Sequence, residues 1–322
     1  MELIRGLHNL KPRHRGCVMT IGNFDGLHRG HQAVLAELRD AAQARGLPLL
    51  LMTFEPTPKE MFAPDQAPAR LATLREKAEL AARHGVDRML CARFDKRFAA
   101  QSPEEFVENV VVRCLAAEVV MVGADFRFGA KRAGDFALLE QMGRDGVQGQ
   151  TFEARVMPTV ELSGERVSST AVRQALADGQ PGKAAELLGR SYCMSGRVTG
   201  GQRLGRTLGV PTANLIIRRK PAPCFGVYAV LAELEDGRQL PAAASLGVRP
   251  TVNGQGCVLE VHLLDFSETL YGQHMKVHFQ HFLRPEKRFD DVPALRDAMM
   301  QDIAEVRRLL AADAIQTAGS QP

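Results

Sequence analysis

Short apolar runs alternate with amphipathic segments through the first half of the chain. The apolar runs are nearly continuous, as in strands covered on both faces, and predict strands at 17–21, 47–54, 88–94 and 118–123. The segments with helical spacing of apolar residues predict helices at 32–38, 73–85, 102–114, 136–144 and 169–177. Repeated strand–helix units predict an α/β fold, a doubly wound parallel sheet with helices on both faces.

The pattern changes after the turn-forming stretch 179–182. One more short helix is predicted at 183–188, and the strands predicted beyond it are 227–234, 239–246, 258–264 and 275–282. In the third of these strands, period-two alternation places Glu260 and His262 on one face. A last amphipathic helix is predicted at 293–310, and 311–322 is expected to form a flexible tail. We therefore predict one domain over 1–182 and a second over 183–310, an antiparallel β-barrel with a C-terminal helix.

Composition narrows the classes of function. With 322 residues, 45% of them hydrophobic and 24% charged, the chain has the balance of a globular protein of two domains. A net charge of only +4, no Trp and 3 Tyr argue against nucleic acid as a partner, because such partners need strongly basic or aromatic surfaces. The 6 cysteines form no CxxC pair, and charges interrupt the apolar runs. We expect a cytoplasmic protein with free thiols and no membrane span.

The segment from Gly22 to His31 carries the strongest functional signal. Its sequence, GNFDGLHRGH, joins a predicted strand to a predicted helix, and the unpaired N–H groups of a helix start attract anions. His28 and His31 are spaced to place two imidazoles on one side of the turn. A metal site is the alternative, but no third ligand lies at suitable spacing. The segment predicts a nucleotide-phosphate site made by Gly22, Asn23, Phe24, Asp25, His28 and His31.

Two further segments are candidates for the same nucleotide. The segment 168–173, SSTAVR, is a predicted helix start, and simple helix capping is the more common reason for such a sequence. A second anion site there would use the polar groups of Ser168, Ser169, Thr170 and Arg173. The segment 123–129, GADFRFG, follows a buried strand, and ligands of α/β sheets bind at the carboxyl ends of strands. Asp125 and Arg127 are therefore nucleotide-binding candidates, with a simple turn as the alternative.

Residues 200–207 nearly match the phosphate-binding P-loop pattern, with Arg206 in place of its lysine. A P-loop is rejected because a helix should follow, and Pro211 breaks it. A phosphate-binding loop of another type, using Gly205 and Arg206, remains open.

Three polar residues follow in the second half. Thr212 and Asn214 lie two apart in an extended segment, and their neutral oxygens suit Mg²⁺ completed by water and substrate phosphates. Glu260 is ionisable, but its spacing alone favours a solvent-facing strand residue.

The chain resembles the bacterial FAD synthetases over nearly its whole length. Residues 22–31 resemble the GxFDGxHxGH motif of HIGH-type nucleotidylyltransferases, which implies a Rossmann-like first domain, and TFEPTP, GADFRFG and SSTAVR match in order and spacing. From Gly196 onward the chain resembles the riboflavin kinase module, in the segments GRTLGVPTAN, GVY, SLGVRPTVNG, EVHLLDF and LRPEKRF. Two departures concern flavin contacts: Thr57 stands where His is frequent, and Val252 where Phe is frequent.

The resemblance implies a bifunctional enzyme that makes FAD. The C-terminal module would phosphorylate riboflavin with ATP to give FMN and ADP. The N-terminal module would transfer AMP from a second ATP to FMN, giving FAD and pyrophosphate. The resemblance implies that His28 and His31 hold the ATP phosphates, and that the segment 168–173 closes over the triphosphate.

For the kinase, the resemblance implies that Glu260 is the general base that takes the ribityl hydroxyl proton. It implies Mg²⁺ and phosphate ligands at Thr212 and Asn214. The further residues implied are Gly205 and Arg206 for ATP, and Arg284 and Glu286 in a flap over the flavin.

Two alternatives remain open on the sequence. The first is that only one of the two modules is active. The second is that the chain is a flavin- or nucleotide-responsive regulator that uses the barrel as a binding module. A regulator predicts loss of the catalytic set, whereas Glu260, Thr212 and Asn214 are all present.

Overall fold

A computed structural model describes residues 1–200, 205, 208–217, 222–251 and 254–319. The chain forms two compact units, one of Met1–Pro68 with Ala72–Val167, and one of Ala69–Leu71 with Ser168–Pro322. The predicted domain boundary after residue 182 stays a prediction. Each unit is described by itself below.

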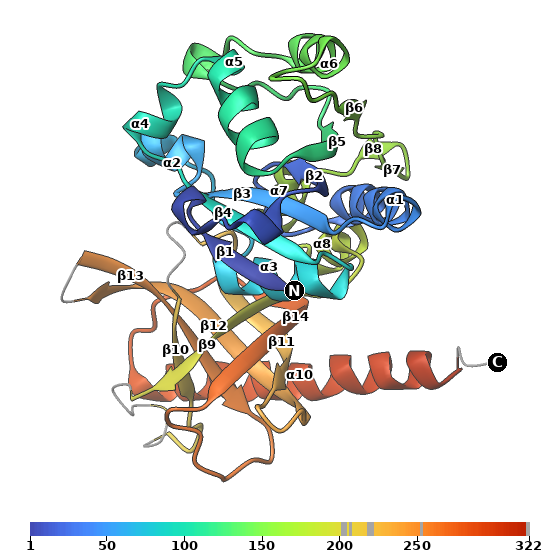
Figure 1. Ribbon diagram of the computed structural model, residues 1–322. Coiled ribbons are helices and arrows are strands. Elements are labelled where there is room, and N and C mark those ends of the chain that lie inside the picture. Colours follow the sequence, from blue (N-terminus) through green and yellow to red (C-terminus); the bar gives the residue numbers. More distant parts are fainter. Residues whose placement is uncertain (201–204, 206–207, 218–221, 252–253, 320–322) are drawn as a thin grey trace. The chain divides into compact units, whose positions relative to one another are not determined.

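The first unit contains a parallel six-stranded sheet with strand order β1-β4-β3-β2-β5-β6 (Figure 1). Its strands are β1 Glu2–Arg5, β2 Cys17–Ile21, β3 Leu49–Glu55, β4 Arg88–Arg93, β5 Ala117–Val122 and β6 Glu153–Val156. The central strands β2, β3 and β5 are buried except at Glu118 of β5 and Glu55 of β3, and the predicted parallel sheet is confirmed. The two edge strands were not predicted, because each is only 4 residues long and carries few apolar side chains.

Helices cover both faces of this sheet, and each face has its own apolar core (Figure 1). On one face, helix α1 contributes Val34, Leu35 and Leu38, and α3 contributes Ala81. On the other face, a π-helical segment, Val107–Cys114, packs with α6. The α-helices of the unit are α1 Arg29–Arg45, α2 Pro58–Phe62, α3 Leu74–Arg83, α4 Lys96–Ala99, α5 Pro103–Phe106 and α6 Phe136–Asp145. A small hairpin, β7 Glu161–Leu162 and β8 Glu165–Arg166, follows β6.

The strand order reverses at β2. From β2 the chain continues to β3 and β4 on one side of it, and then crosses to β5 on the other side. In open α/β sheets the crevice at the carboxyl ends of such strands is where ligands bind. The segments that leave β2 and β5 at this edge are 22–28 and 123–129, both predicted from the sequence to bind nucleotide.

The second unit is a closed antiparallel barrel, with order β10-β13-β12-β11-β14-β9, and the predicted barrel is confirmed (Figure 1). Its strands are β9 Tyr192–Thr199, β10 Ala213–Ile217, β11 Gly226–Glu233, β12 Gln239–Thr251, β13 Gly254–Leu263 and β14 His274–Arg284. Tyr228 and Phe279 fill the interior, with ring centroids 5.0 Å apart in an edge-to-face arrangement.

The remaining helices of this unit lie on the outside of the barrel. Helix α10, Val292–Gly319, covers β11 and β12 through an apolar cluster that includes Val306 and Ala229. It continues beyond its predicted end at Leu310, while flexibility of the tail stays a prediction. The pair α7 Ser169–Ala177 and α8 Pro181–Leu188 packs together, and α8 also contacts β9 and β14.

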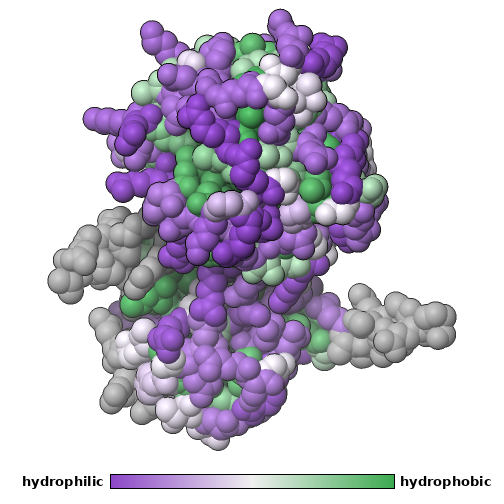
Figure 2. All heavy atoms as spheres, viewed as in Figure 1, coloured by the Kyte–Doolittle hydropathy of each residue, from purple (hydrophilic) through white to green (hydrophobic). Residues whose placement is uncertain are grey.

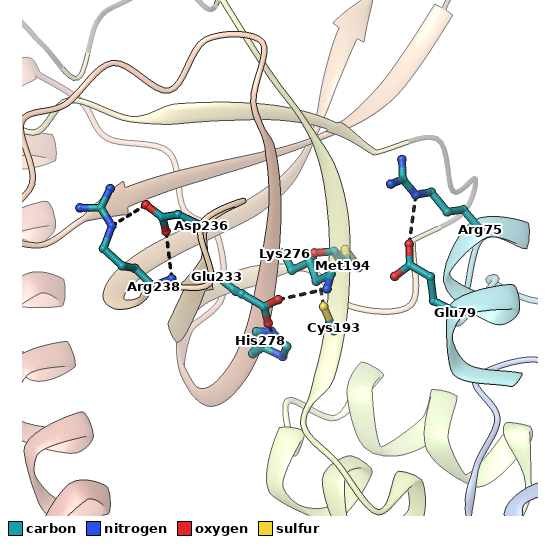
Figure 3. A network of polar contacts seen from close by, with 9 residues as sticks. All are labelled: Arg75, Glu79, Cys193, Met194, Glu233, Asp236, Arg238, Lys276 and His278. Carbon is teal, nitrogen blue, oxygen red and sulfur yellow. Dashed lines mark hydrogen bonds and ion pairs between the residues drawn. The ribbon is translucent and has the colours of Figure 1, made fainter. Parts of the chain in front are cut away.

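Polar side chains cover most of the surface seen in Figure 2, with small apolar patches between them. On the outside of the barrel, Glu233 accepts hydrogen bonds from Lys276 at 3.0 Å and His278 at 2.9 Å (Figure 3). Burial acts to raise the pKa of Glu233, but these two hydrogen bonds outweigh it and lower the pKa.

Candidate active sites

The β2–α1 turn joins the end of β2 to the first residue of α1. Helix α1 begins at Arg29, earlier than predicted, so that His31 lies in its first turn. Two non-glycine residues of the turn have left-handed backbone conformations, Phe24 with φ 46° and Leu27 with φ 43°. Such strained positions persist only where the surroundings hold them, and they are frequent at ligand sites.

His28 and His31 lie together at this turn, as their spacing predicted. Their rings are stacked, with centroids 3.7 Å apart and an interplanar angle of 20°. His28 caps the helix, because its Nδ1 accepts the backbone N–H of His31 at 3.4 Å. A neutral ring that accepts at Nδ1 carries its proton on Nε2, which makes Nε2 a donor for an anion.

The His31 imidazole is an uncharged group at neutral pH. Burial lowers its pKa well below the ordinary value, and electrostatic repulsion from a protonated His28 and from Lys77 lowers it further. Its Nδ1 is buried and has no hydrogen-bond partner among the described residues. A Cβ at Gly30 would lie 3.2 Å from His28 Cε1, so the glycine leaves room for the rings. The turn thus combines backbone N–H groups with the uncharged His31 ring, which suits phosphate oxygens.

The segment after β5 forms a turn at the same edge of the sheet. The N–H of Phe126 donates to the carbonyl of Gly123 at 2.9 Å, and Asp125 is exposed at the tip. Arg127 lies 3.7 Å from Asp135, which caps α6. Asp125 is therefore accessible to a ligand at the switch point of the sheet.

A phenylalanine cluster at this edge was missed by the sequence analysis. Its rings form a chain of contacts with centroids 5.4–6.1 Å apart: Phe62, Phe94, Phe54, Phe98, Phe106, Phe128 and Phe126. Phe54 is buried at the end of β3, whereas Phe62 is 66% exposed. The residues are scattered over more than seventy positions of the sequence, so no local pattern marks them. An exposed aromatic edge of this kind suits a flat ring system.

The helix start at Ser168 behaves as an N-cap. Ser168 Oγ accepts the backbone N–H of Ala171 at 3.1 Å, and Arg173 Nε donates to the carbonyl of Ala69 at 2.6 Å. Thr170 is exposed and Ser169 is partly buried. Both hydrogen bonds lie within the second unit, so contact of this segment with the triphosphate stays a prediction.

A cavity of about 230 Å³ opens in the barrel unit. It brings together the predicted kinase residues Gly205, Thr212, Asn214, Glu260, Arg284 and Glu286. Arg206 lies outside the described residues. Lys287 and Phe289, from the predicted flap segment 283–289, also line it, and the lining residues that were not predicted include Ser245, His262 and Asp302.

Strand register explains how three of these residues meet. Glu260 on β13 pairs with Asn214 on β10 and with Ser245 on β12, which places them side by side across the sheet. His262, two residues further on the same face, lies 2.8 Å from the carbonyl of Pro211 through Nδ1 and so holds the segment that carries Thr212. Asn214 Nδ2 donates to the carbonyl of Thr212 at 3.4 Å, so Asn214 Oδ1 points away from that carbonyl.

The rim of the cavity is held by charged residues at the end of β14. Arg284 makes a two-pronged ion pair with Asp302 of α10, with N–O distances of 2.9 and 2.7 Å. Glu286 accepts a hydrogen bond from Ser245 at 3.3 Å. The Phe289 ring lies 5.0 Å from Lys287 Nζ and 5.7 Å from the Arg284 guanidinium carbon. The predicted flap residues therefore face the same cavity as Glu260.

Of the two residues that depart from the family pattern, the structure describes Thr57 and does not describe Val252. Thr57 caps the short helix α2 and forms a capping box with Glu60. Val252 lies outside the described residues.

Comparison with known proteins assigns both units. A FAD synthetase family model matches residues 10–171, and a riboflavin kinase family model matches residues 188–310. The bifunctional riboflavin kinase/FMN adenylyltransferase of Pseudomonas fluorescens is 50% identical, over 98% of this chain and 99% of its own. That of Escherichia coli K12 is 48% identical, over 94% of this chain and 96% of its own. The chain belongs to the bifunctional riboflavin kinase/FMN adenylyltransferase family.

The family arrangement assigns FMN adenylyltransferase to the N-terminal part and riboflavin kinase to the C-terminal part. A solved structure from Streptococcus pneumoniae, described as a macrolide-efflux protein, has a TM-score of 0.79 at 29% identity and covers 95% of this chain and 99% of its own. Among the described residues, no helix is long and apolar enough to cross a membrane. The same residues contain no cluster of three or more metal-binding side chains of the His, Cys, Asp and Glu type.

Proposed function

We propose that the β2–α1 turn binds the ATP phosphates for FMN adenylylation. In this reaction an FMN phosphate oxygen attacks the α-phosphorus of ATP, and the bond from that phosphorus to pyrophosphate breaks. The turn would hold the phosphates through the N–H groups of the α1 start and through His28 and His31. These donors stabilise negative charge in the transition state without taking a proton. Support comes from the stacked imidazoles at 3.7 Å and the uncharged state of His31.

The phenylalanine cluster is the proposed platform for the isoalloxazine ring of FMN. It lies at the carboxyl edge of the sheet, where Phe54 ends β3 and Phe126 follows β5. Asp125, exposed in the same turn, would contact the nucleotide. The hydroxyls of Ser168, Ser169 and Thr170, with Arg173, are proposed to close over the triphosphate.

The barrel cavity is the proposed kinase site. Glu260 would take the proton of the riboflavin 5′-hydroxyl. The hydroxyl oxygen would attack the γ-phosphorus of ATP, and ADP would leave. The position supports this role, because Glu260 lines the cavity beside Asn214 and Ser245. Arg284 and Glu286 would contact the flavin at the rim, and Gly205 and Arg206 would contact ATP.

Thr212 and Asn214 would hold Mg²⁺ with the ATP phosphates. The fit rests on hard oxygen donors: the Thr212 hydroxyl and the Asn214 Oδ1, beside the carboxylate of Glu260. Bound there, Mg²⁺ would neutralise charge on the transferred phosphoryl group. We also place the enzyme in the cytoplasm, where ATP is available and where its free cysteines stay reduced.

Two variants of the full chain test the division of labour. His28→Asn with His31→Gln removes both imidazoles but keeps a helix-capping side chain at position 28. This variant should lose conversion of FMN to FAD and keep phosphorylation of riboflavin, whereas Glu260→Gln should do the reverse. Flavins separated over time from incubations with ATP, Mg²⁺ and either riboflavin or FMN provide the measurement. Loss of both activities in either folded variant would refute the assignment.

A further inference from the structure

A buried lysine lies behind the β2–α1 turn. Lys77 of α3 is 5% exposed. Among the described lysines and arginines, it is the only one that is buried. Burying an ammonium group costs free energy unless hydrogen bonds and charge partners compensate. The contacts of Lys77 therefore indicate what the buried charge serves.

Lys77 reaches the turn through Thr53. Its Nζ lies 3.2 Å from Thr53 Oγ1, and Thr53 Oγ1 lies 3.2 Å from the carbonyl oxygen of Asn23. A threonine hydroxyl has one proton, which goes to the carbonyl, so the hydroxyl accepts from the ammonium group. Thr53 is fully buried near the carboxyl end of β3. The chain of hydrogen bonds thus runs from α3 through β3 to the backbone of the turn.

Helix α3 holds the same turn at a second point. The backbone N–H of Ala72, just before the helix, donates to Asp25 Oδ1 at 3.0 Å. Thr73 caps the helix in a capping box with Glu76, so this end of α3 is well defined. Asn23 and Asp25 flank Phe24, whose left-handed backbone needs such support.

The charge of Lys77 also acts on His31. Burial is the main cause of the low pKa of His31, and the charges of His28 and Lys77 add to it. The His31 ring, which would face the phosphates, thus stays a neutral hydrogen-bond donor. The positive charge lies behind the turn, on Lys77.

We propose that Lys77 is a positioning residue for adenylyl transfer, which fixes the β2–α1 turn through Thr53 and places a positive charge behind the proposed phosphate site. The proposal rests on the proposed role of the turn. The contact that carries the proposal runs from Lys77 to the turn through the Thr53 hydroxyl, which is why we call Lys77 a positioning residue. A lysine that only stabilises the fold would leave the histidines and the transfer rate unchanged in a folded variant.

Lys77→Met tests the charge, because it keeps an unbranched chain in the buried site. We expect kcat for FMN adenylylation to fall about 100-fold, as for other small displacements of reacting groups. Riboflavin phosphorylation by the same chain should not change. Arg75→Met is the matched control, since Arg75 lies on the same helix, is 69% exposed and pairs with Glu79 at 3.1 Å (Figure 3).

Thr53→Val and Thr53→Ser separate the hydrogen bonds from the charge. Thr53→Val breaks the link to Asn23 and should lower kcat about tenfold, whereas Thr53→Ser keeps the hydroxyl and should retain the wild-type rate. Histidine-ring NMR of the full chain, with His31→Gln to identify the signal, reports the charge directly. The titration midpoint of His31 should rise in Lys77→Met and stay in place in Thr53→Val and Arg75→Met.

Wild-type adenylylation in both Thr53→Val and a folded Lys77→Met would overturn the proposal, as would an unmoved His31 midpoint in Lys77→Met. If Lys77→Met does not fold, full activity of Thr53→Val alone overturns it. The histidine double variant separates this outcome from failure of the proposed site. If that variant still makes FAD from FMN, the turn itself is wrongly assigned.

Discussion

The two units build their candidate sites in opposite ways. In the first unit, one continuous turn at the carboxyl end of a buried strand supplies the backbone groups and both histidines. In the barrel, side chains from distant strands, a loop and α10 meet around one cavity. A contiguous site depends on the backbone conformation of a few residues, whereas a barrel site depends on strand register. Substitutions in the first unit should therefore act through the conformation of this one turn, and those in the barrel through pairing partners.

Glu260→Gln should have the largest effect of the predicted substitutions. A positioned general base contributes roughly 10²–10⁴ to a rate, and glutamine keeps the shape of the side chain but not its basicity. We expect riboflavin phosphorylation to fall by that range, with FMN adenylylation unchanged, in steady-state assays with each flavin. A loss below tenfold would show that another group takes the hydroxyl proton.

Removal of the imidazoles should come next. Loss of a preorganised donor to a developing charge costs about 10²–10³ in kcat. We expect His31→Gln alone to lower FMN adenylylation by that factor, because glutamine cannot take the stacked position against His28. Phosphorylation of riboflavin serves as the internal control. An equal loss of both rates would contradict the assignment of the two reactions to separate units.

Asp302→Asn sharpens the comparison by testing a pairing partner. The substitution removes the charge that orients Arg284, whose contacts with Asp302 are 2.9 and 2.7 Å. We expect the KM for riboflavin to rise about tenfold with a smaller change in kcat. Glu268→Gln is the control, because its two-pronged pair with Arg238 is exposed. An unchanged KM would remove Arg284 from the flavin site.

Glu233→Gln should have the smallest effect of these substitutions. It should lower the stability of the fold and leave both activities unchanged. The folded state lowers the pKa of Glu233, so its ionised form stabilises the fold above the unfolded pKa of about 4.3. That contribution is about 0.5–1 kcal/mol, and it is lost as pH falls through the lower folded pKa. Chemical denaturation at pH 7 and at pH 3 should show the variant less stable only at pH 7. A larger difference at pH 3 would contradict the sign.

The sequence predicted what local patterns encode. Continuous apolar runs marked the central strands, Thr73 marked the start of α3, and the spacing of His28 and His31 brought their rings together. Thr212 and Asn214 were singled out by their spacing and neutral oxygens, whereas Glu260 was found by resemblance, because its spacing alone indicated only a strand face.

The missed features depend on tertiary contacts. Edge strands β1 and β6 are short and gain their conformation from a neighbouring strand. The Phe62 to Phe126 cluster, Asp302 and Lys77 are placed by packing between segments far apart in the chain. A lysine in an amphipathic helix such as α3 gives no local sign that it is buried.

Complementation in one tube tests the central claim most directly. The histidine double variant should make only FMN from riboflavin, and Glu260→Gln should make little product from it. Mixed together with riboflavin, ATP and Mg²⁺, the two variants should make FAD, because FMN released by one is adenylylated by the other. FAD from riboflavin in the histidine variant alone, or no FAD in the mixture while each variant keeps its remaining activity, would contradict two separate sites joined by free FMN.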